Sequence, residues 1–208
     1  MRQHTLAVCI CCMVVMVTPL ALSAQSSSVS DPGSAVSSFD AGTAGLVKIY
    51  SNLGPPHQRY DANRGWKIRE YHWVAMPFTI EADATITQIK IGIQHVSKTN
   101  SFTLYLVEDA EGLPLGQVDG QWSLNHLPPV GSCCTLKVVN DSQGIKVQKG
   151  EKYWLVAGTD ATNFQTTDQW AFTWNHTHSN DVAVLLAPLE WKAVHGGVSA
   201  FAIYGTKP

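Results

Sequence analysis

The stretch from Gly144 to Asp160 has the clearest hydrophobic pattern in the chain. A short β-prone run at 144–147 meets a turn at 149–151, and a second run follows at 152–159. Side chains on a strand alternate between its two faces, and in the second run both faces are apolar. We therefore expect this strand in the middle of a sheet that is covered on both sides. The two faces carry Tyr153, Leu155 and Ala157 on one side and Trp154, Val156 and Gly158 on the other.

The stretch 84–95 alternates between apolar and polar residues, which predicts an antiparallel strand with one buried face. The run at 102–107 follows a turn and is its expected hairpin partner. In the run 71–80, Pro77 favours a sheet edge or a bulge, because proline has no N–H to donate. The expected buried face of 84–95 is Thr85, Thr87, Ile89, Ile91 and Ile93, and the expected exposed face is Ile86, Gln88, Lys90, Gly92 and Gln94.

No segment has a sustained helical period of 3.6 residues, and glycine and proline separate many short β-prone runs. This pattern predicts an all-β fold, an antiparallel jelly-roll-like β-sandwich of about ten short strands in a single domain over 46–206. Residues 51–65 read as a long irregular loop that ends at Trp66. The other expected strands are 46–50, 121–124, 134–139, 169–175, 182–186, 190–194 and 198–204.

The first 24 residues have the three parts of a secretory signal peptide: a basic start at Arg2, an apolar run at 6–17 and small residues at 21, 23 and 24. The apolar run is shorter than the ~20 residues that span a membrane, although an uncleaved anchor is the alternative. Residues 25–45 are rich in serine, glycine and alanine and are expected to form a disordered leader. The mature protein is therefore expected to be secreted or periplasmic.

Charge narrows the range of partners. Removing Arg2 with the signal leaves 13 basic residues against 16 acidic ones, a net charge of −3. A sparsely charged, slightly acidic surface argues against nucleic acid and against an anionic membrane as partners. We expect a monomer.

Several turns and aromatic positions between residues 49 and 205 form a recognisable set: Ser51–Gly54, Tyr60–Asp61, Gly65–Trp66, Ala75–Phe78, Glu111–Gly116, Gly150–Val156, Trp170 and Phe201–Gly205. This set resembles the corresponding positions of secreted bacterial choice-of-anchor domains. These are β-sandwich modules that occur with varied C-terminal anchors, including PEP-CTERM sorting tails. The resemblance implies an extracytoplasmic module and brings no catalytic residues with it. Because no apolar tail follows the last strand, we expect no membrane anchor in the mature form.

Two of the five cysteines, Cys133 and Cys134, lie outside the predicted signal peptide, and they are adjacent. Adjacent cysteines can close an eight-membered disulfide ring, and an oxidising compartment favours that state. The prediction is a vicinal disulfide. The alternatives are two reduced thiols on opposite sides of a strand, or dimerisation through one thiol.

The remaining candidates for chemistry are a pair of histidines and a cluster of acidic residues. His176 and His178 lie two residues apart on an extended segment, as in the metal site of cupins, with Asp181 and His195 as further ligands. A polar loop explains the same residues. The acidic residues at 108–111 lie on a turn, where acids are solvated. No nucleophile-elbow or phosphate-loop motif occurs, so we expect neither a cofactor nor an enzyme.

Tryptophans are the main candidates for ligand contact, because sugars stack their C–H faces on aromatic rings. Trp73 and Trp154 have apolar neighbours and are expected in the core. The alternative for the others is a half-buried structural position at the ends of the sandwich. We therefore expect a non-catalytic module with weak glycan or cell-surface binding, or else a structural matrix module, and more remotely a metal-dependent jelly-roll enzyme. The candidate ligand residues are Trp66, Trp122, Trp170, Trp174 and Trp191.

Overall fold

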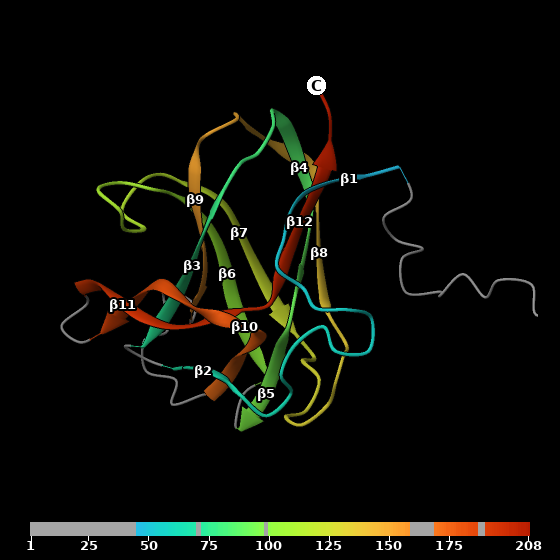
Figure 1. The fold of residues 1–208 in the computed structure, drawn as a ribbon, viewed down its shortest axis with the longest axis vertical. Coiled ribbons are helices and arrows are strands. Elements are labelled where there is room, and N and C mark those ends of the chain that lie inside the picture. The colour runs from blue at the N-terminus through green and yellow to red at the C-terminus, as the bar shows by residue number, and fades with distance from the viewer. Residues whose placement is uncertain (1–44, 70–71, 98–99, 159–168, 187–189) are drawn as a thin grey trace, which may run out of the picture. The chain divides into compact units, whose positions relative to one another are not determined.

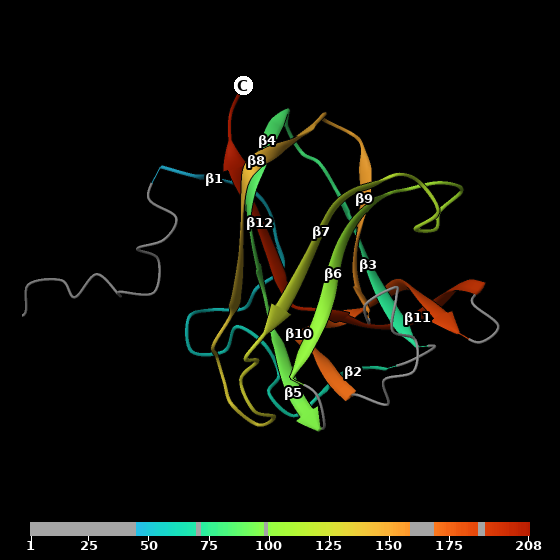
Figure 2. The same ribbon diagram turned by 180° about the vertical axis from the view of Figure 1, so that it is seen from behind.

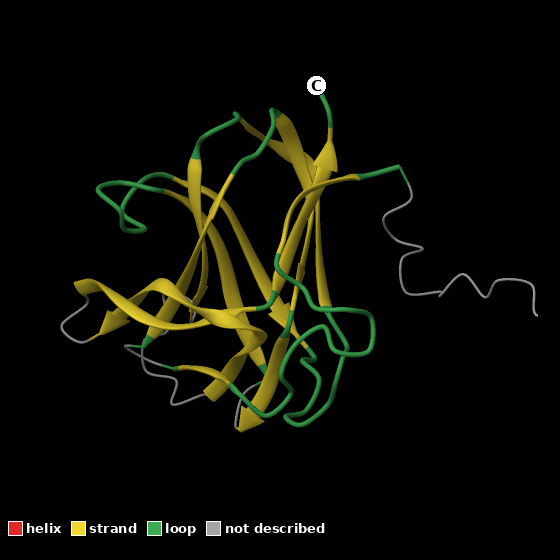
Figure 3. Ribbon diagram, viewed as in Figure 1, coloured by secondary structure: helices red, strands yellow, loops and turns green. Residues whose placement is uncertain are grey.

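The computed structural model describes residues 45–69, 72–97, 100–158, 169–186 and 190–208, of which 169–181, 183, 185 and 186 are described by their backbone alone. These residues form strands and loops (Figure 3). No helix capable of crossing a membrane occurs among them. The predicted signal peptide and leader lie outside the described residues and stay predictions.

The described part of the chain contains twelve strands, which form two antiparallel sheets (Figure 1). Their bounds are β1 (Val47–Ser51), β2 (Gly65–Ile68), β3 (Trp73–Thr79), β4 (Ala84–Ile91), β5 (Ile93–Ser97), β6 (Ser101–Glu108), β7 (Val118–Asn125), β8 (Lys137–Val147), β9 (Lys152–Gly158), β10 (Gln169–Leu186), β11 (Glu190–Ser199) and β12 (Phe201–Thr206).

The strand order is that of a jelly roll. The four-stranded sheet has the order β1-β12-β4-β8, and the eight-stranded sheet has the order β11-β10-β3-β9-β6-β7, with β2 and β5 paired to β10. Eight strands remain when β2, β5, β10 and β11 are set aside, and they pair from the outside of the sequence inward. The pairs are β1 with β12, β3 with β9, β4 with β8, and β6 with β7. That nested pairing defines the jelly roll. The predicted sandwich is confirmed, and the two layers can be followed from both sides in Figures 1 and 2.

Strand β9 lies in the middle of the eight-stranded sheet, between β3 and β6, as its pattern predicts. Every residue from Tyr153 to Gly158 is buried. Leu155 lies in the main core between the sheets, together with residues of both sheets such as Ile89 and Phe201. Trp154 and Val156 point to the other side and belong to a second apolar cluster on the outer face of the sheet. The remaining buried members of that outer cluster are Ala75, Tyr105 and Val107.

The expectation for 84–95 is wrong in three respects. Thr85 and Thr87 are only half-buried, and the residues from Gln88 to Gln94 are buried on both faces. The expected hairpin partner at 102–107 is part of β6, which pairs with β7 and β9 instead. Ile86 is fully buried, and Gln88 and Lys90 are each only 6% exposed. The pairings of β4 with both neighbours shift between Ile86 and Gln88, so one extra residue, Thr87, forms a bulge. An extra residue reverses the alternation, and the isoleucines on both sides of the bulge therefore face the core.

Strand β8 is one strand where two were expected. Four residues, 141–144, bulge out of it between the pairs Gln88–Asn140 and Ile86–Ile145. The Asp141 carboxylate accepts the Gln143 and Gly144 N–H groups, and Gly144 has a φ of +72°. The residues between the two expected strands thus form a bulge within a single strand.

Strand β10 is also continuous where the sequence indicated two strands, and β2 was not expected at all. Strand β2 was missed because its partner, residues 170–173 of β10, lies more than 100 residues later in the sequence. Residues 170–173 of β10 pair with β2, and residues 179–186 pair with β11. Local pattern does not contain that information.

The central position of β9 can be tested with Leu155→Ala. This variant should lose about 2–5 kcal/mol of unfolding free energy, because it leaves a cavity in a closely packed core. Denaturant unfolding measures the loss. Val138→Ala is the control: Val138 lies on β8 and is 44% exposed, so its truncation should change the free energy by less than about 0.5 kcal/mol. Equal losses for the two variants would contradict the central placement of β9.

Candidate functional site

The candidate site begins at an open strand edge. Strand β10 pairs with β3 only along Trp73–Ala75. From Met76 to Thr79, the described strand that pairs with β3 is β9, on the other side. This part of β3 faces an opening at the side of the sandwich.

Pro77 lies on the open side of β3. The Ile80 N–H donates to the Glu151 carbonyl at 2.9 Å, so the backbone of Ile80 faces β9. Hydrogen-bonding direction alternates along an antiparallel strand, and therefore Phe78 also faces β9 whereas Pro77 and Thr79 face outward. The missing N–H of proline thus falls on a side where no described strand pairs with this part of β3. The predicted edge position of Pro77 is confirmed.

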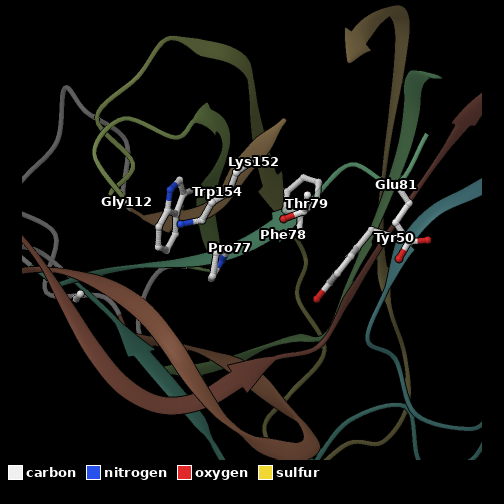
Figure 4. A pocket seen from close by; sticks show the side chains of 9 residues that line it. Tyr50, Pro77, Phe78, Thr79, Glu81, Gly112, Lys152 and Trp154 are labelled. Atoms are coloured by element: carbon white, nitrogen blue, oxygen red, sulfur yellow. The ribbon is translucent and has the colours of Figure 1, made fainter. Parts of the chain in front are cut away.

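A groove of about 640 Å³ runs along this edge (Figure 4). Its wall is the outer part of β3, and it extends from strand β1 of the four-stranded sheet to strand β11 of the other sheet. Figure 4 shows Tyr50 and Glu81 at one end of the groove and Lys152 and Trp154 at the other. The lining residues are Tyr50, Pro77, Phe78, Thr79, Glu81, Gly112, Lys152, Trp154 and Ala193.

Tyr50 is held by an aromatic cluster that joins the two sheets. Its ring stacks on Phe201 of β12 with centroids 4.9 Å apart and lies 5.3 Å from the ring of Phe78 on β3. Figure 4 shows the hydroxyl directed into the groove. Burial raises the pKa of Tyr50, a hydrogen bond with Asn52 lowers it, and the charge of Glu81 raises it, with a net rise above 10.0. The hydroxyl is therefore protonated at neutral pH and can donate a hydrogen bond.

The other end of the groove is fixed by a network of Asp109, Lys152 and Trp154. The Lys152 ammonium lies 3.0 Å from the Asp109 carboxylate and 4.7 Å from the centre of the Trp154 ring. The Trp154 indole N–H donates to the same carboxylate oxygen at 2.6 Å. Trp154 is only 2% exposed, so its ring is part of the fold, and Lys152 is the group at this end that can reach a ligand.

Asp109 is stabilised in its charged form. Burial of the carboxyl raises its pKa. Hydrogen bonds from Lys152 and Trp154, the charge of Lys152 and a backbone hydrogen bond from Gly112 lower the pKa, and together they outweigh the effect of burial. The net pKa lies below the ordinary value of 3.8. Asp109 therefore anchors the Lys152 ammonium at neutral pH.

Three of the five candidate tryptophans have described side chains, and each is half-buried in the fold. Trp66 donates its indole N–H to the Gly197 carbonyl at 2.6 Å, and any side chain at Gly196 would collide with its ring. Trp66 and Trp122 pack against the main core, whereas Trp191 packs against the outer cluster. None of the three lines the groove. Trp170 and Trp174 lie on β10, in the part described by its backbone alone.

The predicted metal ligands also lie mainly on β10. His176 and His178 belong to its backbone-only part, and the pairing of β10 with β11 places Asp181 opposite His195. Among the residues whose side chains are described, no three histidines, cysteines or carboxylates gather in a metal-binding group. Metal binding by His176 and His178 stays a prediction.

Cys133 and Cys134 lie in the loop that leads into β8, and the structure joins them by a disulfide. Cys133 is exposed and Cys134 is half-buried. Their oxidation state in the cell stays a prediction. Neither cysteine lines the groove, and Cys134 lines a separate small cavity of about 170 Å³.

Sequence reasoning missed the residues that line the groove. Tyr50, Glu81 and Lys152 come from β1, from the turn after β3 and from β9, and no motif links them. The one available signal was Pro77, which marked an edge within an otherwise β-prone run. An edge is where a groove between two sheets can open.

No protein-family model, no curated protein and no solved structure matches the chain. The site is therefore interpreted from its own geometry.

The Asp109 network predicts a pH dependence of stability. A carboxyl whose pKa is lowered by folding contributes stability above its unfolded pKa, and this contribution disappears as the pH falls through the folded pKa. Asp109→Asn should therefore have a lower melting temperature than the wild type at pH 7, and the difference should narrow below about pH 4. Thermal unfolding followed by circular dichroism measures the melting temperatures of the variant and the wild type at each pH.

The control for this experiment is Glu190→Gln, which removes an exposed carboxylate that is 67% accessible and lies 3.5 Å from Lys192. Its melting temperature should stay close to that of the wild type at each pH, because exposed ion pairs contribute little. A constant difference between Asp109→Asn and the wild type at all pH values would contradict the role of the charge.

Proposed function

We propose that this protein is a non-catalytic, extracellular binding module whose groove takes a segment of a glycan. The observation that carries the proposal is the lining of the groove, which combines apolar surface with hydrogen-bonding groups of several kinds. Pro77, Phe78 and the Tyr50 ring form the apolar part. The Tyr50 hydroxyl, Thr79, Glu81 and Lys152 supply the polar part.

This combination suits a sugar. Each sugar ring has apolar C–H patches between hydroxyl groups, and a site for it needs apolar surface with a few placed donors and acceptors. Tyr50 donates, Glu81 accepts and Thr79 does both, so all three can pair with hydroxyls. The ammonium of Lys152, held in place by Asp109, adds a donor at the opposite end.

The groove is less suited to other polymers. A peptide strand that paired with the open edge of β3 would meet Pro77, which offers no N–H at the centre of the edge. A polyanion would meet Glu81 on a protein of net negative charge. A neutral or amine-bearing glycan avoids both penalties.

Two further considerations support an extracellular binding role. The predicted signal peptide and the resemblance to choice-of-anchor domains support a location outside the cytoplasm. Jelly rolls serve as lectin domains, although a fold by itself does not assign a function. The proposal includes no reaction: Glu81 is the one carboxylate among the described residues lining the groove, and glycoside cleavage commonly uses two.

The test is a binding survey of the mature protein against immobilised and soluble polysaccharides, followed by titration of one that binds. Glu81→Gln should weaken binding roughly tenfold, because a hydrogen bond to a charged group is lost. Tyr50→Phe keeps the stacked ring and removes the hydroxyl, so it should weaken binding about fivefold without a large loss of stability. Isothermal calorimetry measures affinity, and thermal unfolding measures stability.

Glu190→Gln is the matched control, since it makes the same chemical change on an exposed part of β11 outside the groove lining. It should bind as the wild type does. If the survey finds no ligand, or if Glu81→Gln and Tyr50→Phe bind with unchanged affinity, the groove is not the glycan site.

A further inference from the structure

The cysteine pair lies in a loop that is held by hydrogen bonds on both sides. The Tyr60 hydroxyl donates to the Ser132 carbonyl at 2.7 Å and to the Thr135 carbonyl at 3.1 Å. The Gln94 side chain also donates to Ser132, at 2.7 Å. Tyr60 is 1% exposed and Gln94 is fully buried. Because none of these hydrogen bonds uses a sulfur atom, the loop has support that does not depend on the state of the cysteines.

The two cysteine residues differ in exposure. Cys133 is exposed and Cys134 is half-buried. Cys134 lines a cavity with Arg59, Lys90 and the side chains that follow it in the chain. A reagent from solvent therefore reaches Cys133 first.

The two sulfur atoms also differ in electrostatic surroundings. Cys134 Sγ accepts the Arg59 backbone N–H at 3.3 Å, and Arg59 and Lys90, two residues with cationic side chains, line the same cavity. These groups stabilise negative charge on sulfur. Cys133 Sγ instead lies 3.6 Å from the Tyr60 carbonyl oxygen and 3.9 Å from that of His57. Carbonyl oxygens carry partial negative charge and disfavour a thiolate at Cys133.

From these two differences we propose that Cys133 and Cys134 form a thiol–disulfide exchange site for low-molecular-weight thiols, in which Cys133 receives the external thiol and Cys134 is the leaving group. The accessible sulfur is attacked, and the sulfur in positive surroundings departs. This directionality follows from the position of each atom. It is independent of the groove and of the proposed glycan.

The exchange proceeds by ordinary sulfur chemistry. An external thiolate attacks Cys133 Sγ, a new S–S bond forms there, and Cys134 Sγ leaves with the electron pair of the broken bond. The Cys134 thiolate can then attack Cys133 Sγ, expel the external thiolate and restore the starting state. Alternatively, a second external thiolate attacks the external sulfur of the mixed disulfide and releases Cys133 as a thiolate. In that case two external thiols are oxidised to one disulfide, and the cysteine pair gains two electrons and takes up two protons from solvent.

The first experiment locates the mixed disulfide. Protein purified from an oxidising compartment without reductant should contain no titratable thiol outside the signal peptide. On brief exposure to glutathione, acid quenching and peptide mass mapping, the glutathione adduct should be found on Cys133. Cys134→Ser, reacted with glutathione disulfide, should keep its adduct, because the thiol that resolves it is absent. An adduct mainly on Cys134, or two free thiols at the outset, would overturn the proposal.

The second experiment tests the leaving group and needs no cysteine variant. Arg59→Met removes the guanidinium but keeps the backbone N–H, and reduction of the disulfide by glutathione should become roughly threefold slower or more, since the rate depends on the stability of the departing thiolate. Arg64→Met is the matched control, because it removes an exposed arginine of the same 52–64 loop that does not line the cavity. Its rate should equal that of the wild type. Equal rates for all three proteins would show that Arg59 does not stabilise the leaving thiolate and would refute this assignment.

Discussion

The burial of β9 on both of its faces is the constraint on which the rest of this structure depends. In a two-sheet sandwich one face of each sheet lies against the other sheet, and the outer face can be solvated. Trp154 and Val156 make the outer face at β9 apolar, so that face needs its own cover. Trp191 of β11 and Leu113 of the loop between β6 and β7 pack against it. The strands added to the jelly roll are thus part of a second core.

The arrangement of the strands that cover this outer face also leaves room for the groove. Strand β10 reaches the outer cluster by pairing with β3, but it pairs along only three residues of that strand. The remaining edge of β3 stays open toward β1, and the groove occupies this opening. The aromatic cluster of Tyr50, Phe78 and Phe201 closes the main core just behind it. A packing requirement on one face of the sheet therefore leads to a cavity at its edge.

The sequence predicted those features of the fold that depend on a pattern within one short run of residues. The two-faced run at 152–158 predicted a central strand, because burial on both sides is encoded within seven residues. The bulge at Thr87 was not predictable, since a single extra residue reverses the alternation and only the pairing with β8 and β12 reveals it. Strand β2 pairs with residues 170–173 of β10, which lie more than 100 residues later in the sequence, and local propensity does not encode such a pairing. The same holds for the candidate functional residues. Cys133 and Cys134 are adjacent in sequence and were predicted as a pair, whereas Tyr50, Glu81 and Lys152 come together only in the folded chain.

Pro77 has a consequence for encounters between copies of this protein. An unpaired strand edge is a template on which another copy can add its own strand, and such growth leads to aggregates. At Pro77 the incoming strand would find no donor for one of its carbonyl groups, and an unpaired carbonyl is costly. The residue that gives the groove part of its apolar wall therefore also opposes edge-to-edge growth. A molecule built in this way can keep an open edge available for a ligand while remaining separate from its neighbours.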